Sequence, residues 1–206
     1  MRRRPFTVAL TGGLAAGKSE ALRAFARCGA WTLSLDELAH GLCRRGGPAY
    51  RSVVKAFGDC VLDENGEIGR RALASVVFGR PGRLKRLEAA THPHILREMR
   101  RRLACCRAAV AVVDVPLLFE KGLSGEFDSS VLLRAPAGLR LKRAALRGMS
   151  RADARRRMRA QWPQAKKEPL ADVVLPNDNS PDDLRRAARE LFRAFRLIAT
   201  SPQGDR

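Results

Sequence analysis

Residues Gly12–Ser19 have the types and spacing needed to bind phosphate, because they match the pattern G-x-x-x-x-G-K-[ST] at every constrained position. An apolar run, Phe6–Leu10, precedes them, and a helical pattern, Ser19–Arg27, follows. A phosphate-binding P-loop needs this order, since a buried strand feeds a tight turn and the next helix points its first amides at phosphate oxygens. The pattern predicts a cradle for a nucleoside triphosphate. The alternative is an ordinary glycine-rich turn with an incidental lysine.

Two side chains of this loop specify the expected chemistry further. Lys18 is predicted to reach the β- and γ-phosphates of ATP, and the Ser19 hydroxyl to bind Mg²⁺. Backbone amides supply the other phosphate contacts, because they lie at the start of a helix. The predicted ATP-binding residues of the loop are Gly13, Leu14, Ala15, Ala16, Gly17, Lys18, Ser19 and Glu20.

Two carboxylates follow predicted strands, at the sheet edge where open parallel sheets bind ligands. Asp36 comes directly after the strand pattern Trp31–Leu35. There it could accept the proton of an attacking hydroxyl or orient that hydroxyl beside the metal, and a helix N-cap is its alternative role. Asp114 comes after the strand pattern Ala109–Val113 and resembles the Walker B acid that holds Mg²⁺. Its alternative is a solvated charge at a strand end.

Arg143 and Arg147 lie four residues apart in a basic helical segment and therefore share a helical face. Two guanidinium groups on one face suit a clamp on phosphoryl oxygens during phosphoryl transfer. In so arginine-rich a segment, a solvated basic face is the alternative. His92 has no cysteine or acidic residue at metal-binding spacing, so a structural role is its default interpretation.

Alternating strand and helix patterns predict an α/β fold with a five-stranded parallel sheet flanked by helices. The stretch between residues 36 and 107 carries four helical patterns and no strand pattern, which predicts a helical subdomain that covers the substrate. A basic helical segment, residues 139–167, and a final helix, residues 182–198, follow, and residues 201–206 are expected to form a disordered tail. The predicted strands are Phe6–Leu10, Trp31–Leu35, Ala109–Val113, Ser130–Leu133 and Asp172–Leu175.

The composition favours anionic partners. The 206 residues include 40 Lys and Arg against 21 Asp and Glu, a net charge of +19. A nucleic-acid partner is disfavoured by the 5% aromatic content and by the absence of a nucleic-acid-binding motif. Five cysteines without metal spacing suit a reducing cytosol, and no apolar run approaches the length of a membrane span. These features predict a cytoplasmic protein of one domain, and we expect a monomer.

The ordered series of motifs resembles dephospho-CoA kinases from the P-loop almost to the final helix. The family's distinctive marks are His92-Pro93 and Asp114-Val-Pro-Leu-Leu-Phe-Glu120, whereas the P-loop is shared with many other families. Further matches are Asp36, Gly47-Pro-Ala49, Phe57-Gly58, Gly66, Arg70-Arg-Ala-Leu73, Val77-Phe78, Leu141-Lys-Arg143, Arg147, Gln161, Ala171-Asp172 and Asn177.

The resemblance implies transfer of the ATP γ-phosphate to the ribose 3′-hydroxyl of dephospho-CoA, the last step of coenzyme A synthesis, with Mg²⁺ as cofactor. It also implies a P-loop kinase fold in one domain of three parts. These are a nucleotide core (about 1–36, 107–138 and 170–200), a helical coenzyme-binding subdomain (about 37–106) and a mobile lid (about 139–169).

The same resemblance places individual residues. Asp36 takes the position of the catalytic carboxylate, and Asp114 that of the strand-end acid. Arg143 and Arg147 fall on the lid arginines. The remaining matches are Asn177, near the adenine pocket, and His92 and Arg70, where the coenzyme-binding subdomain meets the site.

The chain departs from the family pattern at several positions. Ala15 and Ala16 stand where Gly-Ser is usual, and alanine suits the first position only if its φ is negative. Glu20 replaces a threonine, and we expect its carboxylate to point away from the α-phosphate and to weaken ATP binding modestly. Ser34 replaces the first acid of an Asp-x-Asp pair, and Asn179 replaces a glycine.

Two other functions remain open from the sequence. One is phosphorylation of a different small acceptor, such as a nucleoside or nucleotide. The other is a weakly catalytic nucleotide-binding protein whose basic surface binds RNA or another polyanion, which Ala15, Glu20 and the net charge keep in consideration.

Overall fold

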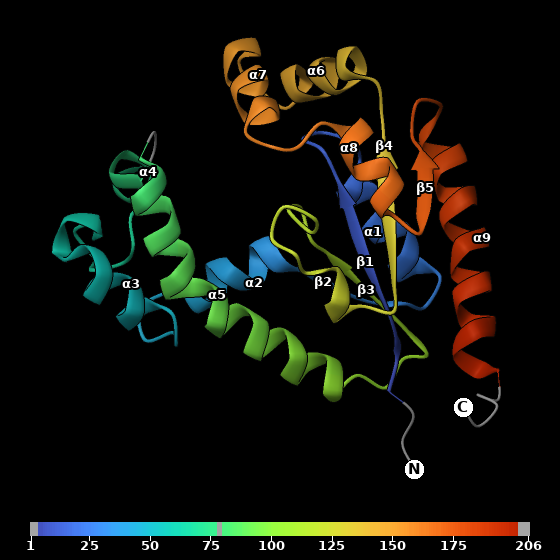
Figure 1. Ribbon diagram of the computed structural model, residues 1–206, viewed down its shortest axis with the longest axis horizontal. Helices are drawn as coiled ribbons and strands as arrows, with labels where there is room; N and C mark the ends of the chain where they lie inside the picture. The colour runs from blue at the N-terminus through green and yellow to red at the C-terminus, as the bar shows by residue number, and fades with distance from the viewer. Residues whose placement is uncertain (1–3, 78–79, 202–206) are drawn as a thin grey trace. The chain divides into compact units, whose positions relative to one another are not determined.

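The computed structural model describes residues 4–77 and 80–201, except for the side chain of Arg70 (Figure 1). Within these residues, five strands form one parallel sheet in the order β2-β3-β1-β4-β5. The predicted α/β fold is therefore confirmed. The strands are β1 (Phe6–Gly12), β2 (Trp31–Ser34), β3 (Val110–Asp114), β4 (Ser129–Arg134) and β5 (Val173–Pro176).

The centre of the sheet is apolar because both of its faces are covered. All five residues of β3 are buried, as are six of the seven in β1. Val8 and Leu10 lie two residues apart and point to the same face. There they join the core that the helices α1 (Lys18–Arg27) and α9 (Pro181–Thr200) complete.

Helix α9 packs against α1 and is amphipathic. Its buried residues Leu184, Ala188, Phe192 and Phe195 recur at helical spacing, and the Phe195 ring stacks on Phe6 with 5.6 Å between the ring centroids. A capping box fixes the start of the helix, because the Ser180 side chain accepts a hydrogen bond from a backbone amide of the first turn.

Asp128 holds the start of β1 beside the start of β4. Its carboxylate accepts hydrogen bonds from the Arg4 guanidinium at 2.7 and 2.8 Å, and from the amide and hydroxyl of Thr7, each at 2.8 Å. Partial burial disfavours the charged carboxylate, but the hydrogen bonds from Arg4 and Thr7 outweigh it, so the pKa of Asp128 is lowered.

The basic segment after β4 is helical, as predicted, with breaks near Gly148 and Pro163. Gly148 has φ +78°, a left-handed conformation that ends a helix. Ser150 then caps the next helix by accepting the amide of Asp153 at 3.1 Å. The helices of this segment are α6 (Ala137–Leu146), α7 (Arg151–Arg159) and α8 (Gln164–Lys167).

The described chain divides into two compact units. One contains the residues up to Ser34 and from Cys106 onward, and the other is Leu35–Cys105. In the second unit, the long helix α5 contacts the other three helices. These helices are α2 (Leu35–Leu42), α3 (Tyr50–Phe57), α4 (Arg70–Val77) and α5 (Pro81–Ala104).

The elements differ from the predicted ones mainly at their ends. Helix α2 begins at Leu35, so β2 ends one residue earlier than predicted and Asp36 lies inside the first helical turn. The predicted tail, residues 201–206, lies outside the described residues except for Ser201. No described helix combines the length and the apolar character that crossing a membrane requires.

Candidate active site

The loop Gly12–Gly17 joins β1 to α1 and presents free amides at the start of that helix. Gly12 has φ +155°, and a Cβ there would lie 2.9 Å from the carbonyl oxygen of Leu133, so glycine lets β1 and β4 approach closely. Gly17 is the N-cap of α1 with φ +105°, and no described side chain caps the helix. Uncapped amides and the positive end of the helix dipole together form an anion site.

Lys18 and Ser19 begin α1, as the P-loop pattern predicts. The Lys18 ammonium donates a hydrogen bond to the carbonyl oxygen of Gly12 at 3.2 Å, which folds the side chain back over the loop. Asp114 ends β3, is only 9% exposed, and is paired in register with Leu10, two residues before the loop. The structure therefore places a cation and a buried carboxylate at the same end of the sheet as the free amides.

An alanine at position 15 was expected to need a negative φ, and the structure shows the opposite. It has φ +56° and is the only non-glycine residue with positive φ among those described. The left-handed conformation brings Cβ close to the following carbonyl, which costs about 1–2 kcal/mol. The loop thus keeps the backbone shape that glycine would adopt freely.

Asn177, the residue that follows β5, holds the P-loop in place. Its side-chain amide donates a hydrogen bond to the carbonyl oxygen of Ala16 at 2.7 Å, and its own backbone amide bonds Arg134 at 2.7 Å. It lies so close to Gly17 that a Cβ at that glycine would collide with it. Asn177 is buried, so the structure gives it a role in holding the P-loop; an adenine contact stays a prediction.

The segment that contains α6, α7 and α8 also contacts the loop. The side-chain oxygen of Gln161 accepts a hydrogen bond from the Leu14 amide at 2.9 Å. The Arg140 guanidinium lies against Gly13, where it would collide with a Cβ, and its burial lowers the pKa of Arg140. Sequence reasoning missed Arg140 and gave Gln161 no role. The available signal was that Arg140 precedes Arg143 by one helical turn.

The two predicted clamp arginines differ in their contacts, and their joint role as a clamp stays a prediction. Arg143 donates to the backbone carbonyl of Asn177 at 3.0 Å and so lies beside the loop. Arg147 is exposed at the end of α6. The pair that the structure brings to the loop is therefore Arg140 and Arg143.

A buried ion pair anchors the end of the same segment. Lys167 is fully buried, and its ammonium lies 2.6 Å from a carboxylate oxygen of Glu120. That oxygen also accepts the backbone amide of Trp162 at 3.0 Å. Removing one partner of such a pair leaves an uncompensated buried charge, which costs about 3–5 kcal/mol. This pair could not be predicted from the sequence, because its partners lie far apart in the chain.

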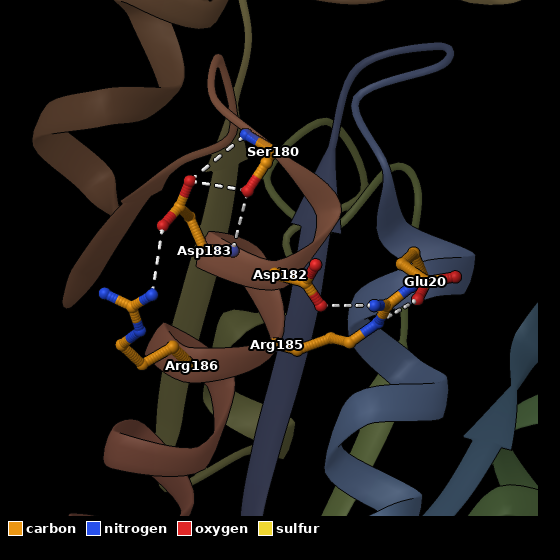
Figure 2. A network of polar contacts seen from close by, with 6 residues as sticks. All are labelled: Glu20, Ser180, Asp182, Asp183, Arg185 and Arg186. Carbon is orange, nitrogen blue, oxygen red and sulfur yellow. Dashed lines mark hydrogen bonds and ion pairs between the residues drawn. The ribbon is translucent and has the colours of Figure 1, made fainter.

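Glu20 turns toward α9. Figure 2 shows its carboxylate bonded to Arg185. The two groups are 3.0 Å apart, and the carboxylate also accepts a hydrogen bond from Arg23 at 2.7 Å. Hydrogen bonds from Arg23 and Arg185 lower the pKa of Glu20. That this carboxylate points away from the α-phosphate and weakens ATP binding stays a prediction.

The helical unit contains the other predicted residues. Asp36 is exposed in the first turn of α2, as its second residue, and is therefore not the N-cap. His92 lies within α5, next to Pro93, and Arg70 begins α4 with its side chain outside the described residues.

A cavity of about 250 Å³ lies within the helical unit, and its lining is mostly apolar. Cys43 lies on this cavity, and burial raises the pKa of its thiol. His40, which carried no predicted role, also lines it. The other lining residues are Ala39, Arg44, Glu67, Ile68, Leu73, Leu87 and Thr91.

The parallel sheet and the P-loop that follows β1 define a P-loop kinase. The sequence matches the model of the dephospho-CoA kinase family over residues 6–183. The chain belongs to the dephospho-CoA kinase family, which makes it an ATP-dependent kinase and confirms the resemblance seen in the sequence.

Individual relatives agree with this family. A dephospho-CoA kinase of Corynebacterium diphtheriae is 38% identical over 192 residues, which cover 91% of this chain and 96% of that protein. A dephospho-CoA kinase of Aquifex aeolicus is 34% identical over 90% of this chain and 95% of its own length. The crystal structure of TT1252 from Thermus thermophilus has a TM-score of 0.83 and 35% identity, covering 93% of this chain and 98% of that one. The dephospho-CoA kinase of Campylobacter jejuni, at 23% identity, shares the fold with a TM-score of 0.61 and covers 93% and 97% of the two chains.

Proposed function

We propose that this kinase transfers the γ-phosphoryl group of ATP to the ribose 3′-hydroxyl of dephospho-CoA, giving ADP and coenzyme A. The bond between the γ-phosphorus and the β,γ-bridging oxygen breaks, and a bond from that phosphorus to the 3′-oxygen forms. The observation that carries the proposal is the start of α1, where the backbone amides have no side-chain cap and Lys18 lies over the loop. The family match over residues 6–183 supports it.

The nucleotide side of the reaction belongs to the P-loop. The amides from Leu14 to Ser19 would bind the phosphates, and Lys18 would move from the Gly12 carbonyl to the β- and γ-phosphates. The Ser19 hydroxyl and the Asp114 carboxylate fit Mg²⁺, because it prefers oxygen ligands and is commonly held by few protein groups together with substrate phosphates. Bound there, Mg²⁺ would neutralise phosphate charge.

The acceptor side belongs to the helical unit. Asp36 is exposed, so its carboxylate can orient the 3′-hydroxyl and accept its proton as the new bond forms. His92 and Arg70 would contact the acceptor, and the mostly apolar cavity suits its pantetheine arm. Residues 37–106 would thus form the coenzyme-binding subdomain.

Residues 139–169 would act as the lid. Arg140 and Arg143 lie at the loop and would stabilise charge on the phosphoryl oxygens in the transition state. Arg147 would join them only when the lid closes over bound nucleotide.

The direct test measures ADP release from ATP and Mg²⁺ with and without dephospho-CoA, with mass spectrometry for coenzyme A. We expect acceptor-dependent ADP and an equal amount of coenzyme A. A panel of nucleosides and nucleotides serves as the control for other acceptors. Equal turnover with another acceptor, or no turnover by folded protein, would overturn the proposal.

Two substitutions test the residue roles. Lys18→Ala should abolish turnover, because it removes the cation that neutralises the phosphates. Asp36→Asn should lower kcat strongly while ATP affinity stays nearly unchanged. An equal loss of ATP affinity would show that Asp36 binds nucleotide or supports folding instead.

Light scattering checks the proposed monomer against the chain mass of 22.7 kDa, and fractionation of cells checks the proposed cytoplasmic location.

A further inference from the structure

A hollow lined by arginines lies beside the last turn of α1, at the opposite end of that helix from the P-loop. Its volume is about 380 Å³. Arg27 is nine residues after Lys18, which places it about 14 Å farther along the helix axis. The residues that line the hollow are Arg27, Cys28, Arg189, Phe192, Arg193 and Arg196.

The hollow concentrates positive charge from two helices. Arg189, Arg193 and Arg196 follow the spacing i, i+4, i+7, so they share one face of α9, and Arg27 comes from α1. No carboxylate is among the lining residues. In the described part of the chain, none of these four guanidinium groups has an ion pair with a carboxylate.

The two arginines in the first half of α9, in contrast, are paired with carboxylates. Figure 2 shows Arg185 between Glu20 and Asp182, and Arg186 facing Asp183. Arg186 and Asp183 are 3.6 Å apart. The helix thus neutralises its first two arginines and leaves the next three facing the hollow. The helix dipole does not account for this, because Arg189 and Arg193 lie well before the end of α9 at Thr200.

The lining also has the chemistry of a phosphate site. Guanidinium groups bind phosphate oxygens in a bidentate manner, and several are needed to neutralise a phosphate chain. Phe192 forms an apolar floor beside Gly29, where a Cβ would lie 3.9 Å from the ring.

We propose that this hollow is a second anion site, which binds a compact polyphosphate chain, either free or attached to a nucleotide. It is separate from the P-loop, so its occupant is not the phosphoryl donor of the proposed reaction. Because the site joins α1 to α9, its ligand stabilises the packing of the helix that carries Lys18.

Calorimetric titration with inorganic tripolyphosphate tests the proposal. The full-length protein should show two binding events. Lys18→Ala should remove one of them, and the triple variant R189Q/R193Q/R196Q should weaken the other at least tenfold. Because each event has its own variant, failure of this site and failure of the P-loop assignment are distinguishable.

A second triple variant controls for the loss of net charge. R83Q/R86Q/R97Q removes the same charge from exposed positions of α5 and should keep both events. The single variant R193E tests the site if the triple variant does not fold. A parallel titration with ADP distinguishes the sources: equal affinity for the second site shows that the phosphate chain suffices, and tighter binding of ADP shows that the base contributes. One binding event in the full-length protein, or equal weakening by the two triple variants, would overturn the proposal.

Discussion

Replacing Ala15 by glycine should stabilise the protein, although it deletes a methyl group. Ala15 has φ +56°, and a left-handed alanine costs about 1–2 kcal/mol. Glycine adopts this conformation freely, but it adds about 0.4–1 kcal/mol of conformational entropy to the unfolded chain. The difference predicts a gain of about 0.5–1 kcal/mol, or roughly 1–4 °C in Tm for a chain of this length.

Urea unfolding and thermal melting of Ala15→Gly measure this gain. The matched control is Ala16→Gly, one residue later in the same loop. Ala16 is buried and its φ is not positive, so its glycine variant should lose about 1 kcal/mol through backbone entropy and the lost methyl contact. Opposite signs for the two variants are expected. A neutral or destabilising Ala15→Gly would refute the assignment of strain to Ala15.

Three further predictions concern the loop and the sheet. Asn177→Ala should lower the free energy of unfolding, measured with urea, by about 1–3 kcal/mol, because it leaves the Ala16 carbonyl unpaired. The Asn177→Asp side chain cannot donate that hydrogen bond, so wild-type stability in this variant would contradict the role of Asn177. Arg140→Gln should raise the Kd for ATP about ten- to hundredfold, because it removes a charge-assisted contact worth about 1.5–3 kcal/mol. An unchanged Kd would exclude Arg140 from the phosphate site. Asp128 has a lowered pKa in the folded state, so its carboxylate stabilises the protein above its unfolded pKa of about 3.9 and loses this effect as the pH falls toward the folded value. The Tm of the wild type should therefore fall more steeply between pH 5 and pH 3 than that of Asp128→Asn, and parallel slopes would contradict this.

The strands and the P-loop could be predicted because their signals are local. A buried parallel strand reads as a continuous apolar run, and the P-loop pattern fixes residue types at fixed spacing. The boundary at Leu35 was wrong by one residue, because an apolar residue fits both the end of β2 and the buried face of α2.

What the sequence could not provide depends on residues far apart in the chain. Arg140 and Arg143 lie on one helix and both contain a guanidinium, so only the folded structure shows which groups lie beside Gly13 and Asn177. The buried contact between Lys167 and Glu120 has the same origin. The φ of Ala15 is set by the closure of the loop, and residue type alone predicts the opposite sign.

The hydrogen bond from the Leu14 amide to Gln161 has a kinetic consequence for nucleotide entry. A phosphate oxygen that takes this amide must displace the glutamine, so binding exchanges one partner for another. The net gain from this amide is then small, and its main effect is on timing. Displacement of Gln161 removes one contact between the P-loop and the segment that connects α7 to α8, while the bond from the Trp162 amide to Glu120 still holds that segment.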